Sequence, residues 1–259
     1  MFSTTPAKHR RTHFCASVAL ALLAVLVHAS SNAQGQENRP ARAEQASASE
    51  ALTVRQQAIV PMAAFAAAGD IAKLNTALNQ GLDAGMTVSD AREILVQLYA
   101  YAGFPRSLNA LAELMKVLEA RKKRGIQDAT GTAPVRPIPK GDALLAAGTA
   151  NQTKLLGAPV KGALFDFAPA IDEYLKTHLF GDIFERDNLD WQSRELATVS
   201  MLSVLPGAES QLQAHMRVSM NVGLTASQLR QLTQVLAGRV DTEASRRARE
   251  ALERALNTK

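Results

Sequence analysis

The chain has 259 residues, of which 47% are apolar and only 5% aromatic, so it can bury a sizeable core in one large domain or two small ones. Abundant alanine and leucine with few aromatic residues favours helices over a sheet sandwich. The formal charge of +5 is compatible with a nucleic-acid-binding protein, but the distribution of that charge along the chain excludes this class.

Residues 1–33 have the pattern of a secretory signal. A basic stretch precedes an apolar run from Phe14 to Val27, and small residues lead up to Ala33. The run has 14 residues, fewer than the roughly 20 that span a bilayer. We therefore expect cleavage near Ala33 and a periplasmic or secreted protein, with an uncleaved anchor as the alternative.

Loss of this segment changes both the charge and the cysteine content. It leaves 26 basic and 24 acidic residues, a formal charge of +2. No basic patch with interleaved aromatic residues remains, so no nucleic-acid partner is expected. The single cysteine, Cys15, is also removed, which excludes a disulfide, a reactive thiol and a cysteine metal site.

The rest of the chain divides into four segments. Residues 34–51 are polar and predict a flexible leader. Residues 52–124 and 164–259 have helical apolar spacing. Residues 125–163 are rich in proline and glycine and predict a linker with at most one short helix around "DALLAAG".

Several residues mark helix ends. Gly85 and Gly223 follow apolar-periodic runs and are typical of left-handed C-terminal caps. Thr225 with Gln228 three residues later matches a capping box. Pro61 lies inside an apolar stretch and is expected to kink or interrupt that helix.

The helix ends reveal an internal repeat. "RQQAIVPMAAFAAAGDIAKLNTALNQGLDAGMTVSDAREILVQL" aligns with "RELATVSMLSVLPGAESQLQAHMRVSMNVGLTASQLRQLTQVL". The alignment pairs Gly69 with Gly207, Gly85 with Gly223, and Thr87 with Thr225. No strand-like alternation interrupts either copy. The sequence therefore predicts an all-α protein of two related helical modules around a pseudo-twofold axis.

The two modules differ in their chemistry. His215 and Glu195 in the second copy correspond to Ala77 and Gln56 in the first. Antiparallel packing of two helices across "LPGAE" can bring Glu195 and His215 together, and a carboxylate beside an imidazole is suited to proton transfer. The alternative is structural: Glu195 favours a helix N-terminus and His215 packs. His178 and His215 have no carboxylate cluster at ligand spacing, so no metal site is expected.

Three stretches carry a family resemblance: "SDAREILVQLYAYAGFPRSLNAL" (89–111), "LFGDIFERDNLDWQSRELATVSMLSVL" (179–205) and "LQAHMRVSMNVGLT" (212–225). They resemble the carboxymuconolactone decarboxylase family, whose fold also includes alkylhydroperoxidase D, and the resemblance covers nearly everything from about residue 52. It implies an all-helical oligomer. Because single-module members assemble as rings, we expect a homotrimer of two-module chains.

This family has two kinds of chemistry, and the residues of this sequence discriminate between them. The alkylhydroperoxidase branch uses C-x-x-C with a histidine four residues after the second cysteine, where this chain has Ala208 and Gln211. Thiol peroxidase chemistry cannot run without a thiolate, so a peroxiredoxin-type activity is not expected.

The other branch resembles the lactone decarboxylase, which needs no metal or organic cofactor. The resemblance implies that His215 donates or shuttles a proton, that Glu195 orients it, and that Arg194 faces the carboxylate of a small unsaturated acid or lactone. An ordinary surface role on its helix is the alternative for Arg194.

The aromatic segment "YAYAGFP" of the first module supplies Tyr99, Tyr101 and Phe104 as candidate substrate-binding residues, whereas the second module has "LAGRVDT" there. Each chain therefore has one complete set of site residues, with the acid–base pair in the second module and the aromatic segment in the first. Either a single site forms between the modules, or the protein is a non-catalytic periplasmic small-molecule-binding or scaffold protein. No membrane partner is expected after cleavage of the signal peptide.

Overall fold

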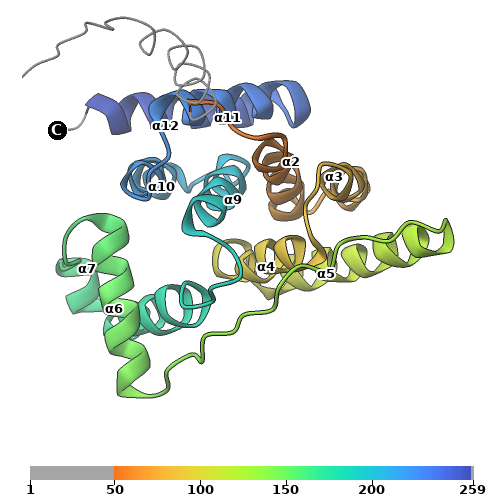
Figure 1. Ribbon diagram of the computed structural model, residues 1–259. Helices are drawn as coiled ribbons and strands as arrows, with labels where there is room; N and C mark the ends of the chain where they lie inside the picture. Colours follow the sequence, from red (N-terminus) through yellow and green to blue (C-terminus); the bar gives the residue numbers. More distant parts are fainter. Residues whose placement is uncertain (1–49, 258–259) are drawn as a thin grey trace, which may run out of the picture. The chain divides into compact units, whose positions relative to one another are not determined.

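A computed structural model describes residues 50–257, so the predicted signal peptide and most of the predicted leader lie outside the described residues. The part described contains helices and no strand, and the all-α prediction is confirmed. Figure 1 shows their arrangement. The elements are α2 (Val54–Ala68), α3 (Ile71–Asp83), α4 (Val88–Gln97), α5 (Tyr99–Lys123), α6 (Asp142–Leu156), α7 (Ala163–Phe167), α8 (Pro169–Tyr174), the π-helix η1 (Leu175–Ile183), α9 (Trp191–Ser203), α10 (Glu209–Asn221), α11 (Ala226–Arg239) and α12 (Thr242–Asn257).

The helix ends follow the local sequence. Gly85 and Gly223 adopt φ of 88° and 98°, the left-handed region in which a side chain would be strained. Thr225 forms the predicted capping box with Gln228. Thr87 caps α4 in the same way. Both of the glycine caps and the capping box predicted at Thr225 are therefore confirmed.

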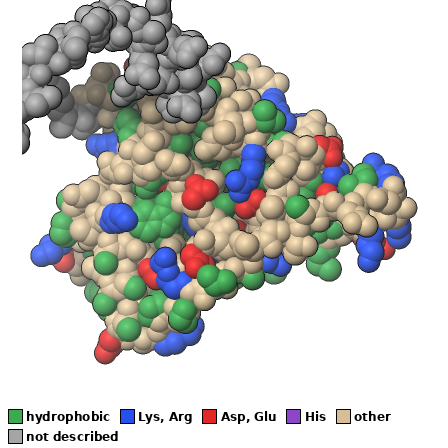
Figure 2. All heavy atoms as spheres, viewed as in Figure 1, with side chains coloured by type: hydrophobic (Ala, Val, Ile, Leu, Met, Phe, Trp, Pro, Cys, Tyr) green, Lys and Arg blue, Asp and Glu red, His purple; other side chains and the backbone are tan. Residues whose placement is uncertain are grey.

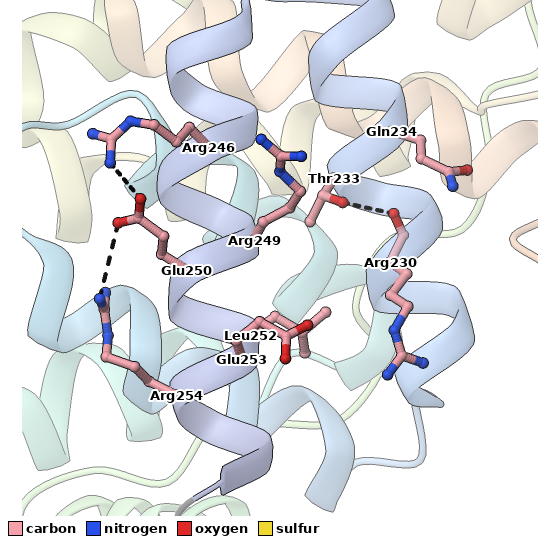
Figure 3. Close-up of a pocket in the computed structure, with 9 residues that line it drawn as sticks. All are labelled: Arg230, Thr233, Gln234, Arg246, Arg249, Glu250, Leu252, Glu253 and Arg254. Atoms are coloured by element: carbon pink, nitrogen blue, oxygen red, sulfur yellow. Dashed lines mark hydrogen bonds and ion pairs between the residues drawn. The ribbon is translucent and has the colours of Figure 1, made fainter.

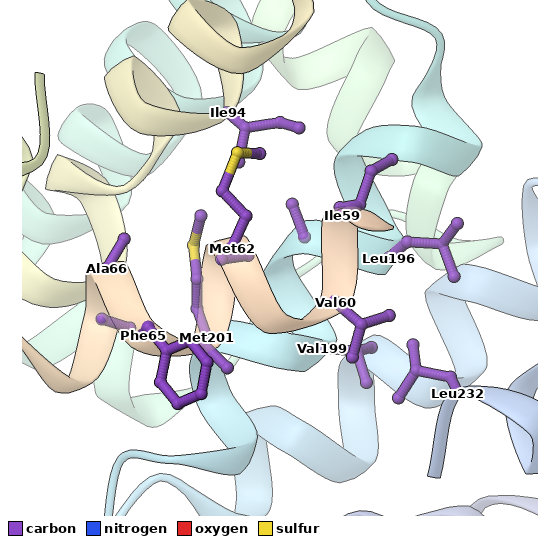
Figure 4. Close-up of a cluster of buried hydrophobic side chains, with 14 of the residues drawn as sticks. Ile59, Val60, Met62, Phe65, Ala66, Ile94, Leu196, Val199, Met201 and Leu232 are labelled. Carbon is purple, nitrogen blue, oxygen red and sulfur yellow. The ribbon is translucent and has the colours of Figure 1, made fainter. Parts of the chain in front are cut away.

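The helices α2 to α5 correspond in order to α9 to α12. Their contacts correspond as well, because α2 packs on α3 as α9 packs on α10, and α4 packs on α5 as α11 packs on α12. The equivalent helices α2 and α9 pack directly against each other (Figure 4). At their contact lie the equivalent pairs Val60/Val199 and Met62/Met201, all four fully buried. This correspondence supports the two-module prediction.

Of the two effects expected at Pro61, a kink or an interruption of its helix, the interruption is wrong. α2 runs without a break from Val54 to Ala68 through Pro61. Every residue from Ala58 to Ala67 is buried. We infer that packing on all sides of this helix outweighs the loss of one backbone hydrogen bond, which in an exposed helix costs about 3 kcal/mol.

The segment predicted as a linker also contains more structure than expected. The short helix expected around "DALLAAG" is α6, which has 15 residues and lies across η1 (Figure 1). The close approach requires Gly148, because a Cβ there would lie 1.7 Å from the carbonyl oxygen of Lys176. A glycine that lowers helix propensity in the sequence therefore serves packing in the fold.

The extended part of the predicted linker, before α6, forms hydrogen bonds with two other parts of the chain. Val88 and Ser89 donate their backbone N–H groups to the carbonyls of Ala129 and Thr130. Further along, the carboxylate of Asp187 accepts the backbone N–H groups of Val135 and Arg136 at 2.9 and 3.1 Å. These bonds fasten the segment to the start of α4 and to the loop before α9.

The charged side chains on the face seen in Figure 2 are mixed, with Lys and Arg lying beside Asp and Glu. Between residues 50 and 257, no helix combines the length and the apolar character that a membrane crossing requires.

Candidate functional site

Glu195 and His215 lie together between α9 and α10. The imidazole Nδ1 is 2.8 Å from Glu195 Oε2. The Glu195 side chain is completely buried, whereas that of His215 is 15% exposed. Because Nδ1 is engaged by the carboxylate, Nε2 is the ring nitrogen that can exchange a proton with a ligand.

Local sequence places the two side chains. Asp190 caps α9 by accepting the N–H of Ser193 at 2.7 Å, which fixes Glu195 in the second turn of that helix. Gly207, with φ of 86°, reverses the chain before α10 begins. The antiparallel packing that results brings the middle of α10 over the first half of α9.

Tyr101, from the first module, completes the site. Its ring meets the imidazole of His215 edge to face, with centroids 5.6 Å apart. Its hydroxyl is buried and has no hydrogen-bond partner in the described part of the chain. Burial raises the pKa of this phenol, and the nearby charge of Glu195 raises it further. The Thr198 hydroxyl lies close enough to lower this pKa, but it does not form a hydrogen bond with the phenol. The hydroxyl is therefore a neutral donor.

The other two aromatic candidates form a separate pair. Tyr99 and Phe104 stack with centroids 4.7 Å apart and planes 10° from parallel. Phe104 is 64% exposed, while Tyr99 packs on a small apolar cluster that includes Phe180 and Phe184. The break at Gly103, with φ of 81°, separates the turn bearing Tyr99 and Tyr101 from the rest of α5.

Arg194 is placed differently from the expectation. Its side chain is fully buried and pairs with Glu93 at 3.5 Å. It also donates to Gln97 Oε1 at 3.2 Å and to the carbonyl oxygen of Arg186 at 3.0 Å. These partners turn the guanidinium toward α4. Arg194 therefore does not lie at the surface, and its guanidinium faces Glu93 rather than a ligand carboxylate. Burial lowers the pKa of Arg194, and Glu93 opposes that effect.

Sequence reasoning missed the polar face of α4 that receives Arg194. Asp90, Glu93 and Gln97 are buried at helical spacing, and Glu93 accepts two hydrogen bonds of 2.6 Å from Arg186. Gln97 donates to Thr198 in α9 at 2.8 Å. The signal was present, because three polar residues at i, i+3 and i+7 share a helix face that packs on another helix.

Glu195, His215 and Tyr101 do not line any of five pockets found among residues 50–257. The largest of them by volume, about 710 Å³, lies between α11 and α12 (Figure 3), where Arg246 and Arg254 both pair with Glu250. A pocket of about 440 Å³ includes Ala214, the neighbour of His215. Since only 15% of the His215 side chain is exposed, the imidazole has limited access to solvent.

Within residues 50–257 no group of three or more histidine, cysteine, aspartate or glutamate residues is arranged to hold a metal ion. The chemistry that the site can offer through its own side chains is proton transfer by an oriented imidazole, beside a neutral phenol.

A family model described as Carboxymuconolactone decarboxylase family matches residues 169–254. The matched range includes both Glu195 and His215. A search among curated proteins finds no match.

Proposed function

Residues 169–254 belong to the carboxymuconolactone decarboxylase family, and from this premise we propose that the protein is a cofactor-independent decarboxylase or lactone-processing enzyme for a small unsaturated carboxylic acid or lactone. The observation that carries the proposal is the 2.8 Å contact between Glu195 and His215 beside the ring of Tyr101. A buried carboxylate behind a partly exposed imidazole is the arrangement of an oriented acid–base group.

In the proposed reaction the bond between the substrate and its carboxylate breaks and carbon dioxide leaves. The bonding electrons pass into the conjugated lactone or unsaturated acid, which gives an enolate-like anion. His215 Nε2–H then protonates the carbon, while Glu195 balances the imidazolium that carries this proton. The neutral hydroxyl of Tyr101 is available as a hydrogen-bond donor in the same region.

A screen of carboxylated unsaturated lactones and unsaturated acids tests the proposal, with carbon dioxide release as the readout. His178→Gln is the matched control, because His178 also faces a carboxylate, that of Asp182 at 3.2 Å, but its side chain is exposed. A substrate turned over by the wild type and by His178→Gln, but not by His215→Gln, supports the proposal. Equal turnover by all three proteins contradicts it.

A second candidate function is non-catalytic binding of small molecules in the periplasm. The 15% exposure of His215 and the different linings of the described pockets favour it. A saturable ligand that the wild type binds without converting it distinguishes this function from the first.

We also propose that the protein is exported, with its mature N-terminus near Gln34, and that it is a homotrimer. The exposed apolar side chains of Phe104, Leu108 and Met115 along α5 support self-association. N-terminal sequencing of the exported protein and sedimentation equilibrium test these two proposals separately.

A further inference from the structure

The repeat places a second position opposite the Glu195–His215 site. A separation of 138 residues pairs Gly85 with Gly223, and the same separation pairs Ala77 with His215 and Tyr101 with Arg239. At this second position a methyl group thus replaces the imidazole, and a flexible arginine replaces the phenol.

The replacement leaves a cavity. A pocket of about 330 Å³ is lined by residues of α2, α3 and α11, Ala77 and Arg239 among them. We call it the counterpart pocket; its lining is Pro61, Phe65, Lys73, Thr76, Ala77, Gln80, Gly238 and Arg239. Ala77 and Gly238, both small residues, line this pocket together with Arg239, whereas the rings of Tyr101 and His215 meet at the first position.

The charges of the counterpart pocket favour an anion. No acidic residue is in its described lining, whereas Arg239 and Lys73 are cationic. Lys73 pairs with Asp70 at 3.0 Å, so a carboxylate already faces its ammonium group. Within residues 50–257 Arg239 makes one hydrogen bond, from Nη2 to Gln80 Oε1 at 2.8 Å, which leaves further guanidinium N–H groups for a ligand.

The size and the apolar part of the lining define the rest of the ligand. Phe65, Pro61 and Ala77 form the apolar floor of the pocket; Phe65 is 8% exposed, and the Lys73 ammonium lies 5.5 Å from the centroid of its ring. A cavity of about 150 Å³ accommodates benzene, so about 330 Å³ is sufficient for a ring with a polar substituent.

We propose that the counterpart pocket binds a small organic anion with a flat apolar body, such as an aromatic carboxylate, whose carboxylate lies on Arg239 and whose body lies against Phe65 and Pro61. Without an imidazole or a buried carboxylate in its lining, the pocket binds the anion and does not transform it. This inference is independent of catalysis at His215.

Calorimetric titration of the whole chain with benzoate tests the proposal, with benzamide as a neutral ligand of the same shape. We expect saturable binding of benzoate that Arg239→Gln weakens at least tenfold, because a charge-assisted pair is lost. Arg230→Gln, an arginine on the same helix outside the pocket, and His215→Gln are expected to leave the affinity unchanged. Ala77→Met, which fills the cavity, is expected to abolish binding; if that variant does not fold, Arg239→Gln carries the test.

Three results would overturn the proposal: no saturable binding of benzoate, equal affinity for benzamide, or loss of binding in His215→Gln with full binding in Arg239→Gln. The third result would place the ligand at the candidate active site, and would thus strengthen the proposed function while rejecting the counterpart pocket.

Discussion

Glu195 holds its carboxylate away from solvent, with one oxygen facing His215 and the other, Oε1, without a hydrogen-bond partner in the described part of the chain. A buried carboxylate that loses its donor incurs a desolvation cost of about 1–3 kcal/mol. His215 therefore contributes to stability through this contact as well as offering a proton. Substitutions at His215 can separate its effect on stability from its effect on turnover, because some of them keep a hydrogen-bond donor to Glu195 and others remove it.

His215→Gln is expected to lower turnover by roughly 10²- to 10⁴-fold while costing no more than about 1 kcal/mol of folding free energy, because an amide can still donate to Glu195. His215→Ala removes the donor and is expected to cost about 1–3 kcal/mol more. Urea denaturation and turnover measured on the same preparations test this. A large loss of stability in His215→Gln with activity per folded molecule intact would identify a structural histidine.

Tyr101→Phe removes a buried hydroxyl that has no partner, so it is expected to leave stability unchanged or raise it by up to about 1 kcal/mol. Turnover is expected to fall at least tenfold, because a donor beside the reacting group is lost. The urea midpoint and kcat are the two measurements. A stability loss above about 1 kcal/mol would show that the hydroxyl is a structural hydrogen-bond donor instead.

At the scale of elements, the helix ends were predictable because a few residues determine them locally: Gly85, Gly223 and the Thr225–Gln228 box act within one turn. The course of α2 through Pro61 and the length of α6 were not predictable, because both depend on which distant helices pack against them. Arg194 was misplaced for the same reason. Its sequence neighbour Glu195 pointed to the site, but its partner Glu93 lies about a hundred residues away.

Gly148→Ala tests the packing of α6 on η1. The added methyl would meet the carbonyl of Lys176, and overpacking of this kind costs about 1–3 kcal/mol. The matched control is Gly238→Ala, where no atom lies within 4 Å of the added Cβ and the higher helix propensity of alanine should stabilise by up to about 1 kcal/mol. Thermal melts of both variants compare them directly. Equal melting temperatures would contradict the close approach.

At the scale of the whole molecule, the buried pair of Glu93 and Arg194, with the partly exposed Arg186, joins α4 in the first module to α9 and the loop before it in the second. Burial acts to raise the pKa of Glu93, but hydrogen bonds from Arg186 and the charge of Arg194 outweigh it and hold this pKa below its usual value. The stability contributed by Glu93 is therefore complete above the unfolded-state pKa of about 4.3 and is lost as the pH falls through the folded-state value.

Glu93→Gln is expected to cost about 3–5 kcal/mol at neutral pH, because it leaves the fully buried Arg194 without a carboxylate. The variant should also lose less stability than the wild type between pH 5 and pH 3, since its side chain does not titrate. Urea midpoints across this range test both expectations. If the urea midpoints of the two proteins fall in parallel as the pH is lowered, Glu93 does not determine the loss of stability at acid pH.

The packing of α2 on α9 has a consequence for biosynthesis. The apolar surface of α2 is complete once the ribosome has passed Ala68, and α3 and α5 follow soon after, but the face that packs on α9 waits until Ser203 has been made. At roughly 5–20 residues per second, the nascent chain carries that face uncovered for about 7 to 27 s. The first half of the polypeptide therefore cannot reach its final state during this interval, and a holding chaperone has time to engage it.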